Sequence, residues 1–443
     1  MKWEKLLSDK RFGMESYHDE SKQERTDFQR DYDRLIFSAP FRRLQNKTQV
    51  FPLPGSIFVH NRLTHSLEVA CVGRSLGDIC GKQLFKSSNP ECPALLEMGS
   101  IVSAACLAHD LGNPPFGHSG EKAISTYFSE GNGRDWITEL QARGERVSDF
   151  THFEGNANSL RLLTHQFNGR RKGGFAMTYS TLASIVKYPY TSLNCDPKKG
   201  KFGFFASEEA NYQKIADELE LIKTNESPAQ YVRHPLVYLV EAADDICYQI
   251  MDIEDAHKLK LLSTDECIDL MLNFFSEDKK NRALSIMDMV DDVNEKIAYL
   301  RSSVIGILIN ECCRVFIENE TNILNGKFEK SLIKYIGETP KNAYNTCSKI
   351  AVEKIYRSQI VVDIELAGFR IISFLLDCLL DAVRNPEKKY SGLLIERIPD
   401  QYEKSNANDY TKTQAVIDYI SGMTDVYALD LYRKITGMSL PSL

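Results

Sequence analysis

The stretch Ala104–Pro115, AACLAHDLGNPP, decides how the fold and the chemistry of this sequence are interpreted. Its apolar start continues a helical pattern, and Gly112 with the two prolines that follow predicts the helix end. Adjacent side chains on a regular helix diverge by about 100°, so His109 and Asp110 converge on one ion most easily at such an end. Burying this pair without a counter-charge or a metal is costly. We therefore interpret the pair as metal ligands, with a capping role as the alternative.

An earlier segment, His60–Glu68, begins a predicted amphipathic helix. Arg62 and His65 stand at positions i and i+3 and therefore share one helix face. A lone histidine is more often structural, but the His-Asp pair later in the sequence supports a functional role for His65. The apolar stripe of this helix should face the core; its members are Leu67, Cys71, Val72 and Leu76.

A third segment places acidic side chains along one helical stripe. Asp244, Tyr248 and Asp252 fall at i, i+4 and i+8 among largely apolar neighbours. Carboxylates on such a stripe usually have a partner. Asp245 projects in a different direction, and we expect it to be exposed or paired within the helix.

The three segments together offer a mixed nitrogen and oxygen site. Its four candidate ligands are His65, His109, Asp110 and Asp244. This set suits Mg²⁺, Mn²⁺, Fe²⁺, Co²⁺ or Zn²⁺ better than a thiolate-preferring metal, and the cysteines lack zinc-finger spacing. Four protein ligands would leave positions on an octahedral ion for water and a phosphate oxygen. We expect a divalent metal ion, with Mg²⁺ or Mn²⁺ foremost.

The composition is that of a globular protein. Of 443 residues, 43% are hydrophobic and 26% are charged, and the net charge is -7. This charge argues against a surface coated with positive potential for nucleic acid, so any phosphate ligand must meet a local basic pocket. The 11 cysteines are scattered, which indicates reduced thiols. The sequence shows neither a secretory signal nor a membrane span, and we expect a cytoplasmic protein.

Helical periodicity dominates the chain and predicts an all-α fold with at most a small β-hairpin near Gln49–Val59. Strong helical patterns cover residues 155–165, 235–256, 284–317 and 360–385, and loops are expected at 131–146 and 192–201. We divide the chain into an N-terminal segment (1–30), a core (31–260) and a C-terminal helical region (261–443).

The order Arg62-x-x-His65, His109-Asp110 and Asp244 resembles the HD superfamily of phosphohydrolases. Longer stretches resemble the bacterial dGTP triphosphohydrolases in particular: RRLQNKTQVFPLPG (42–55), NRLTHSLEVA (61–70), AHDLGNPPFGHSGE (108–121), FEGNANSLR (153–161), KYPY (187–190), EAADDICY (241–248) and DYISGMTDVYALDLY (418–432). A bare His-Asp pair is a weak signal, whereas these stretches in this order span nearly the whole chain and are highly specific.

The resemblance implies an HD-domain helical fold with a C-terminal extension, and cleavage of a dNTP to a deoxynucleoside and inorganic triphosphate. By position, the four candidate ligands match the family's metal ligands. The remaining matches are the catalytic pair His118 and Glu121, the 3′-hydroxyl contacts Gln49 and Asp252, and the triphosphate and sugar contacts Arg62, Lys187, Tyr188 and Tyr248. The resemblance also implies a homo-oligomer, often a hexamer, and relatives that bind single-stranded DNA, for which the basic loop 168–174 is a candidate with a solvated loop as the alternative.

Residue chemistry agrees with these roles. A triphosphate carries about four negative charges, which Arg62, Lys187 and a metal ion would neutralise. His118 and Glu121 can form a hydrogen-bonded pair in which the carboxylate raises the basicity of the imidazole. We interpret His118 as the general acid or the proton shuttle toward the leaving 5′ oxygen.

Two alternatives remain open from the sequence. The metal ligands alone also fit an HD-type 5′-nucleotidase or phosphodiesterase. A protein of another class, a nucleotide sensor or a single-strand nucleic-acid binder on the same scaffold, would be expected to have lost ligands. The preferred base cannot be read from the sequence, and the apolar helix around 360–383 fits either an oligomer interface or the core.

Overall fold

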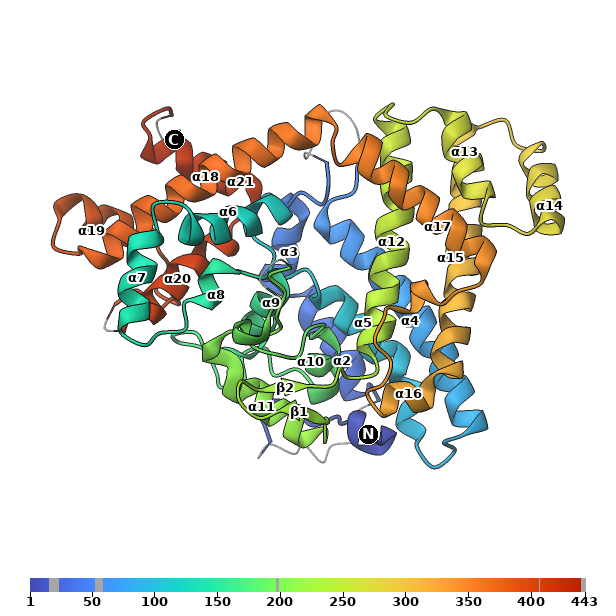
Figure 1. The fold of residues 1–443 in the computed structure, drawn as a ribbon, viewed down its shortest axis with the longest axis horizontal. Helices are drawn as coiled ribbons and strands as arrows, with labels where there is room; N and C mark the ends of the chain where they lie inside the picture. The colour runs from blue at the N-terminus through green and yellow to red at the C-terminus, as the bar shows by residue number, and fades with distance from the viewer. Residues whose placement is uncertain (16–23, 52–58, 197–198, 406, 440–443) are drawn as a thin grey trace.

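The computed structural model describes residues 1–15, 24–51, 59–196, 199–405 and 407–439, and they form a mostly helical protein (Figure 1). Within these ranges the only sheet pairs β1 (Lys223–Asn225) with antiparallel β2 (Gln230–Tyr231), so the all-α prediction is confirmed. The hairpin expected near Gln49–Val59 falls on residues 52–58, outside the described part of the chain. No helix in the described ranges is both long and apolar enough to cross a membrane.

Helix α5 (Met98–Ala108) is the centre of the first hydrophobic core, and almost all of its residues are buried. A helix that is apolar all round requires neighbours on every side. These are α2 (Asp27–Ile36), α4 (Arg62–Ser87), α10 (Tyr179–Ile185) and α12 (Val237–Lys258). A Cβ on Gly77 of α4 would lie 2.7 Å from the Cα of Gly99 in α5, so only glycine permits this close approach.

The buried face of α4 differs from the predicted stripe. Val72 and Leu76 are buried, but Leu67 and Cys71 are exposed. The buried face instead continues the line from His65 through Val69, Val72 and Leu76, at helical spacing. The stripe prediction was therefore wrong for Leu67 and Cys71, because packing on α5 and α12 turns the His65 face inward.

A second core joins an early helical segment to the end of the chain. Helices α6 (His118–Ser129), α7 (Arg134–Ala142) and α8 (Ser148–Thr151) gather with α18 (Gln359–Arg384), α19 (Lys389–Ile395), α20 (Asp409–Ser421) and α21 (Asp425–Ile435) (Figure 1). The loop expected at 131–146 was wrong, because it contains α7. Trp136 and Leu140 bury one face of this helix, and the Arg384 guanidinium lies 4.0 Å from the centre of the Trp136 ring.

The patterns at 155–165, 235–256 and 360–385 each coincide with one helix. The α-helices not named above, several of which were not predicted, are α1 (Trp3–Leu6), α3 (Ala39–Arg43), α9 (Gly155–Thr164), α11 (Glu209–Glu218), α13 (Thr264–Leu272), α14 (Glu277–Met287), α15 (Val293–Glu318), α16 (Glu320–Leu324) and α17 (Glu338–Ile350), with a π-helical turn at Ala351–Ile355. The pattern at 284–317 spans two helices, since the Asp292 side chain caps α15 by accepting a hydrogen bond from the Glu295 amide.

Candidate active site

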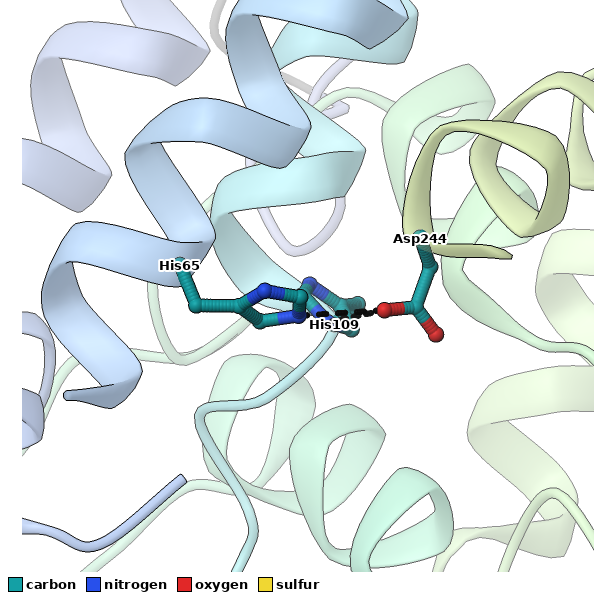
Figure 2. Close-up of side chains that lie close together, drawn as sticks. All are labelled: His65, His109 and Asp244. Atoms are coloured by element: carbon teal, nitrogen blue, oxygen red, sulfur yellow. Dashed lines mark hydrogen bonds and ion pairs between the residues drawn. The ribbon is translucent and has the colours of Figure 1, made fainter. Parts of the chain in front are cut away.

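Three of the predicted metal ligands meet at the ends and faces of separate helices (Figure 2). The His65 Nε2 lies 3.1 Å from the Asp244 Oδ1, and the His109 Nε2 lies 3.6 Å from the same oxygen. One ligand atom from each residue lies within 4.8 Å of the others. Two imidazole nitrogens and a carboxylate oxygen at this separation form a cluster that can hold a metal ion.

Local structure fixes the direction of each of these ligands. His65 lies in the first turn of α4, whose start is capped reciprocally by Asn61 and Thr64. His109 follows the last residue of α5, and its Nδ1 donates a hydrogen bond to the Cys106 carbonyl at 2.6 Å. This bond leaves the Nε2 of His109 free to face Asp244 from α12.

The electrostatics of the cluster favour an ionised carboxylate. Burial alone would raise the pKa of Asp244, but hydrogen bonds from His109 and His65 hold it well below its usual range. Burial alone would lower the pKa of His109, yet the Asp110 and Asp244 carboxylates raise it to about 9. The donor set thus accommodates positive charge, and its residues fit a divalent cation.

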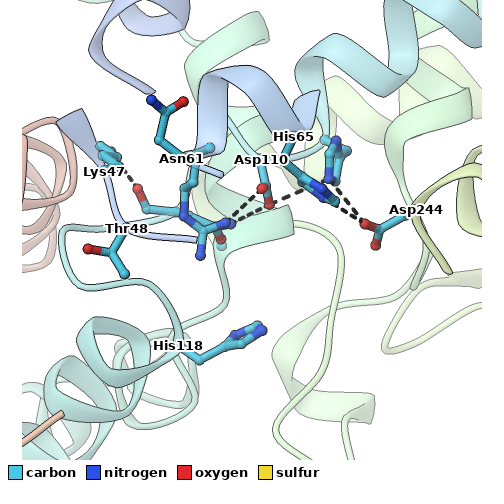
Figure 3. Close-up of polar contacts among 12 residues, drawn as sticks. Lys47, Thr48, Asn61, His65, Asp110, His118 and Asp244 are labelled. Atoms are coloured by element: carbon cyan, nitrogen blue, oxygen red, sulfur yellow. Dashed lines mark hydrogen bonds and ion pairs between the residues drawn. The ribbon is translucent and has the colours of Figure 1, made fainter. Parts of the chain in front are cut away.

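Asp110 lies beside this trio. Its Oδ2 accepts a hydrogen bond from Arg62 Nη1 at 2.7 Å, and its Oδ1 accepts one from Asn113 Nδ2 at 2.5 Å (Figure 3). The Oδ1 is also 3.6 Å from the His109 Nε2. Burial would raise the pKa of Asp110, but the Arg62 guanidinium lowers it. A fourth-ligand role for Asp110 stays a prediction.

A cavity of about 310 Å³ opens beside the cluster, and a second cavity, of about 600 Å³, adjoins it. The smaller one contains Arg62, His109, Asp110, Lys187, Tyr188 and Asp244 in its wall, and both cavities share Gln49, His118, Glu121, Lys201 and Tyr248. Of the residues singled out in the sequence, His65 and Asp252 lie behind the wall rather than in it. The two cavities therefore share one wall, and almost every candidate residue faces them.

His118 and Glu121 form the expected pair on the first turn of α6. The His118 Nδ1 and the Glu121 Oε2 are 2.9 Å apart, and the Glu121 Oε1 accepts a hydrogen bond from the Gly155 amide at 2.8 Å. The hydrogen bond to Glu121 raises the pKa of His118. Burial would raise the pKa of Glu121, but the bond with His118 lowers it to about 2. Because the His118 side chain is 63% exposed, its Nε2 edge remains accessible.

Comparison with known proteins agrees with this geometry. Residues 62–187 match the HD domain, and residues 337–434 match the phosphohydrolase-associated domain. A deoxyguanosinetriphosphate triphosphohydrolase-like protein from Synechocystis is 38% identical, covering 99% of this chain and 100% of that protein. One from Pseudomonas aeruginosa is 39% identical with 100% of both chains covered. The deoxyguanosinetriphosphate triphosphohydrolase of Yersinia enterocolitica is 32% identical, covering 92% of this chain and 93% of the relative.

The chain belongs to the deoxyguanosinetriphosphate triphosphohydrolase-like family. It is an HD-domain phosphohydrolase, and the resemblance found in its sequence is confirmed.

This triphosphohydrolase-like protein has an unsatisfied polar atom on Gln49, which lines both cavities. The Oε1 of Gln49 is buried and has no hydrogen-bond partner among the described residues. Asp252 is already bonded, since Tyr356 donates its hydroxyl proton to the Asp252 Oδ2 at 2.5 Å. Burial raises the pKa of Asp252 to about 7. The Tyr248 ring contacts both the candidate metal cluster and the Asp252 region. Its centre lies 6.4 Å from that of the His65 ring and 6.1 Å from that of the Tyr356 ring.

The two basic side chains predicted to contact the triphosphate, Arg62 and Lys187, are paired with acidic side chains. Arg62 bonds to Asp110, while the Lys187 Nζ lies 3.0 Å from the Glu241 Oε1. Burial would lower the pKa of Lys187, but Glu241 raises it. The Nε of Arg62 is buried without a partner among the described residues, so this guanidinium retains an unused donor.

Three further residues that line one or both cavities were not predicted. Lys201 lies 2.7 Å from Glu154 and 3.9 Å from Glu121. Tyr356 enters from the turn before α18. Asp245, expected to be exposed or helix-paired, instead lines the smaller cavity, and burial raises its pKa to about 7. A single lysine or tyrosine in a turn carries no sequence signal that would have identified the first two.

Proposed function

We propose that the protein hydrolyses dGTP, and other dNTPs as further substrates, to a deoxynucleoside and inorganic triphosphate. The observation that carries this proposal is the wall of the smaller cavity. It brings the cluster's His109 and Asp244, the His118–Glu121 pair and the unsatisfied Gln49 amide to one space. The names of the relatives support the same activity.

The metal would be held by His65, His109 and Asp244, with Asp110 as the fourth ligand. We propose Mg²⁺ or Mn²⁺, with Fe²⁺, Co²⁺ and Zn²⁺ as alternatives for this nitrogen and oxygen set. When bound, such an ion supplies Lewis-acid polarisation of a phosphoryl oxygen. Arg62 would offer its unused Nε donor to the triphosphate.

Lys187 and Tyr188 would complete the triphosphate site. The Lys187 ammonium lies 5.9 Å from the centre of the Tyr188 ring, and both residues line the smaller cavity. Lys187 would divide its positive charge between Glu241 and the phosphate oxygens. The pair would thus line the anion site together with Arg62.

His118 would deliver a proton to the leaving 5′ oxygen. The hydrogen bond to Glu121 raises the pKa of the imidazole and fixes the ring through Nδ1. The Nε2 edge then faces the substrate as a general acid. The Gly155 amide holds Glu121 in turn, so the pair keeps its orientation.

The sugar would be held by Gln49 and Asp252, which we propose as the contacts of the 3′-hydroxyl. The Asp252 carboxylate would accept a hydrogen bond from the 3′-hydroxyl, either in place of the bond from the Tyr356 hydroxyl or in addition to it. Tyr248, on the same helix as Asp252, would occupy the place toward which a 2′-hydroxyl projects. Ribonucleotides should then be poor substrates.

The test is to incubate the purified protein with each dNTP and with GTP in Mg²⁺ or Mn²⁺, and to identify the products. We expect inorganic triphosphate with the deoxynucleoside, and cleavage of dGTP at least ~10²-fold more efficient than of GTP. Tyr248→Ala should narrow this ratio. With a nucleoside monophosphate and a cyclic nucleotide added as further substrates, release of orthophosphate from the first or of a nucleoside monophosphate from the second would instead support the 5′-nucleotidase or phosphodiesterase alternative.

We also propose single-stranded DNA as a regulator and a homo-oligomer, such as a hexamer, as the assembly. A cavity of about 400 Å³ joins Arg170 and Arg171 of the basic loop to Arg34 and Arg43, which supports the first proposal. Exposed Ile360, Val362 and Leu366 on α18 support the second. The cytoplasmic location and the division at residues 30 and 260 stay predictions.

A further inference from the structure

Asp425 connects the end of the chain to two segments near the active site. It is the first residue of α21 and is 8% exposed. Its Oδ1 accepts a hydrogen bond from the Phe116 amide at 2.9 Å. Its Oδ2 accepts bonds from the Thr48 amide at 2.8 Å and from the Thr48 hydroxyl at 2.6 Å. One buried carboxylate thus fixes two backbone positions that lie far apart in the sequence.

Both positions adjoin residues of the cavity wall. Thr48 immediately precedes Gln49, and Phe116 is separated from His118 by Gly117 alone. Gln49 and His118 both line the two cavities. Any movement of the Asp425 carboxylate would therefore be passed to both side chains through one or two residues of backbone.

The backbone at Phe116 needs such support. Phe116 and Gly117 have φ of 63° and 60°, a left-handed region that a bulky residue adopts only when its surroundings hold it there. Gly368 of α18 supplies a second restraint, because a Cβ at this position would lie 2.8 Å from the Phe116 Cβ. The C-terminal helices thus restrain Phe116 through both its amide and its ring.

Lys47, the residue before Thr48, also connects the C-terminal helices to a loop near the active site (Figure 3). Its Nζ donates hydrogen bonds to the Asn113 carbonyl at 2.5 Å and to the Ser421 carbonyl, at the end of α20, at 2.7 Å. The loop after His109-Asp110, the segment before α4 and the α20–α21 turn are therefore joined by consecutive residues, Lys47 and Thr48.

We propose that Asp425 is a positioning residue that sets the distance between Gln49 and His118. For a deoxynucleotide this is the distance between the contacts of the 3′-hydroxyl and of the 5′ oxygen, so the proposal rests on the proposed function for its substrate. The carboxylate suits the task because it accepts all three donors at once, whereas a neutral amide must direct its own N–H groups toward at least one of them.

The first test is Asp425→Asn, with Asp430→Asn as the matched control, since Asp430 is on the same helix and forms an ion pair with exposed Lys434. We expect kcat/KM for dGTP to fall about 10²-fold in Asp425→Asn, as displacement by about 1 Å can cost that much, with metal content unchanged. The control should keep the activity of the unmodified protein. Equal activity of the two variants would overturn the proposal.

A milder variant keeps the test decisive if Asp425→Asn fails to fold. Thr48→Val removes one of the three bonds and leaves the Phe116 bond in place. We expect a several-fold increase in KM with little change in kcat. The unmodified protein should prefer dGTP to 2′,3′-dideoxy-GTP, which lacks the 3′-hydroxyl, and this preference should shrink in Thr48→Val. A uniform loss of activity on both nucleotides would indicate a merely structural role.

Hydrogen exchange separates this proposal from the proposed function. In Asp425→Asn the amides of Thr48 and Phe116 should exchange faster than in Asp430→Asn, at equal global stability and without any substrate. If the unmodified protein cleaves no dNTP, the proposed function fails, and the exchange rates still decide whether Asp425 holds these segments. Unchanged protection at both amides would overturn the positioning role.

Discussion

The two sides of the cavity are built differently. The metal side, named for the proposed metal ligands, consists of side chains on packed helices: His65 on α4, His109 at the end of α5 and Asp244 on α12. The side that carries Gln49 and His118 depends on loop backbone held by hydrogen bonds that Asp425 accepts and Lys47 donates. Packing around a buried helix fixes a side chain to within its rotamer, whereas a strained loop keeps its position only while its bonds last.

The difference indicates that metal binding and turnover can be separated by mutation. Changes on the helical side should remove the metal and the activity together. Changes on the loop side should leave the metal in place and reduce turnover or substrate affinity. The following variants test this division in decreasing order of expected effect.

His109→Ala should abolish hydrolysis, by about 10³-fold or more, because loss of the metal removes several kcal/mol of transition-state stabilisation. Metal content, measured by elemental analysis, should fall in parallel. His257→Ala is the matched control, since His257 lies at the end of α12 and bonds to Thr264. Asp110→Ala should behave like His109→Ala if Asp110 is the fourth ligand. Full metal content and activity in His109→Ala would refute the metal assignment.

Glu121→Gln should lower kcat by roughly 10²-fold while metal content stays unchanged, because Glu121 supports His118 and is not one of the proposed metal ligands. The loss of the carboxylate should also lower the pKa of His118. The protonated imidazole, and with it the activity, should then be lost at a lower pH than in the unmodified protein. The pH dependence of kcat measures this shift. Glu139→Gln, on the exposed face of α7, is the control. Loss of metal from Glu121→Gln would contradict the division between the two sides.

His60→Gln should affect stability more than activity. Burial would lower the pKa of His60, but hydrogen bonds with Asp255 and Glu68 raise it to about 10 from 6.5. A raised pKa in the folded state contributes stability that is full below pH 6.5 and is lost as the pH rises through about 10. The free energy of unfolding, measured with urea, should therefore be much lower in His60→Gln than in the unmodified protein at pH 6 and similar in the two at pH 10. A difference independent of pH would mean that the His60 ion pairs do not stabilise the fold.

Local sequence carried most of the information about the metal side. His109 and Asp110 are consecutive at a recognisable helix end, and Asp244 lies on a periodic stripe of α12. The loop side depends on contacts of long sequence separation, such as the one between Phe116 and Asp425, which are 309 positions apart. Asp425 lies in one of the stretches that resemble the family, yet nothing in its neighbours indicates which amides it binds. For the same reason the exposure of Leu67 and the presence of α7 became evident only from packing.

The link between Asp425 and the loops also bears on how the protein is made. A ribosome releases the segments that carry His65, His109 and Asp244 long before it releases α21, and early segments fold first. A nascent chain can thus assemble its metal side while the loop that leads into α6 and His118 still lacks the Asp425 restraint. Efficient phosphohydrolase activity would then begin only once synthesis has passed α21. A fragment ending before this helix would take up metal without becoming an efficient enzyme.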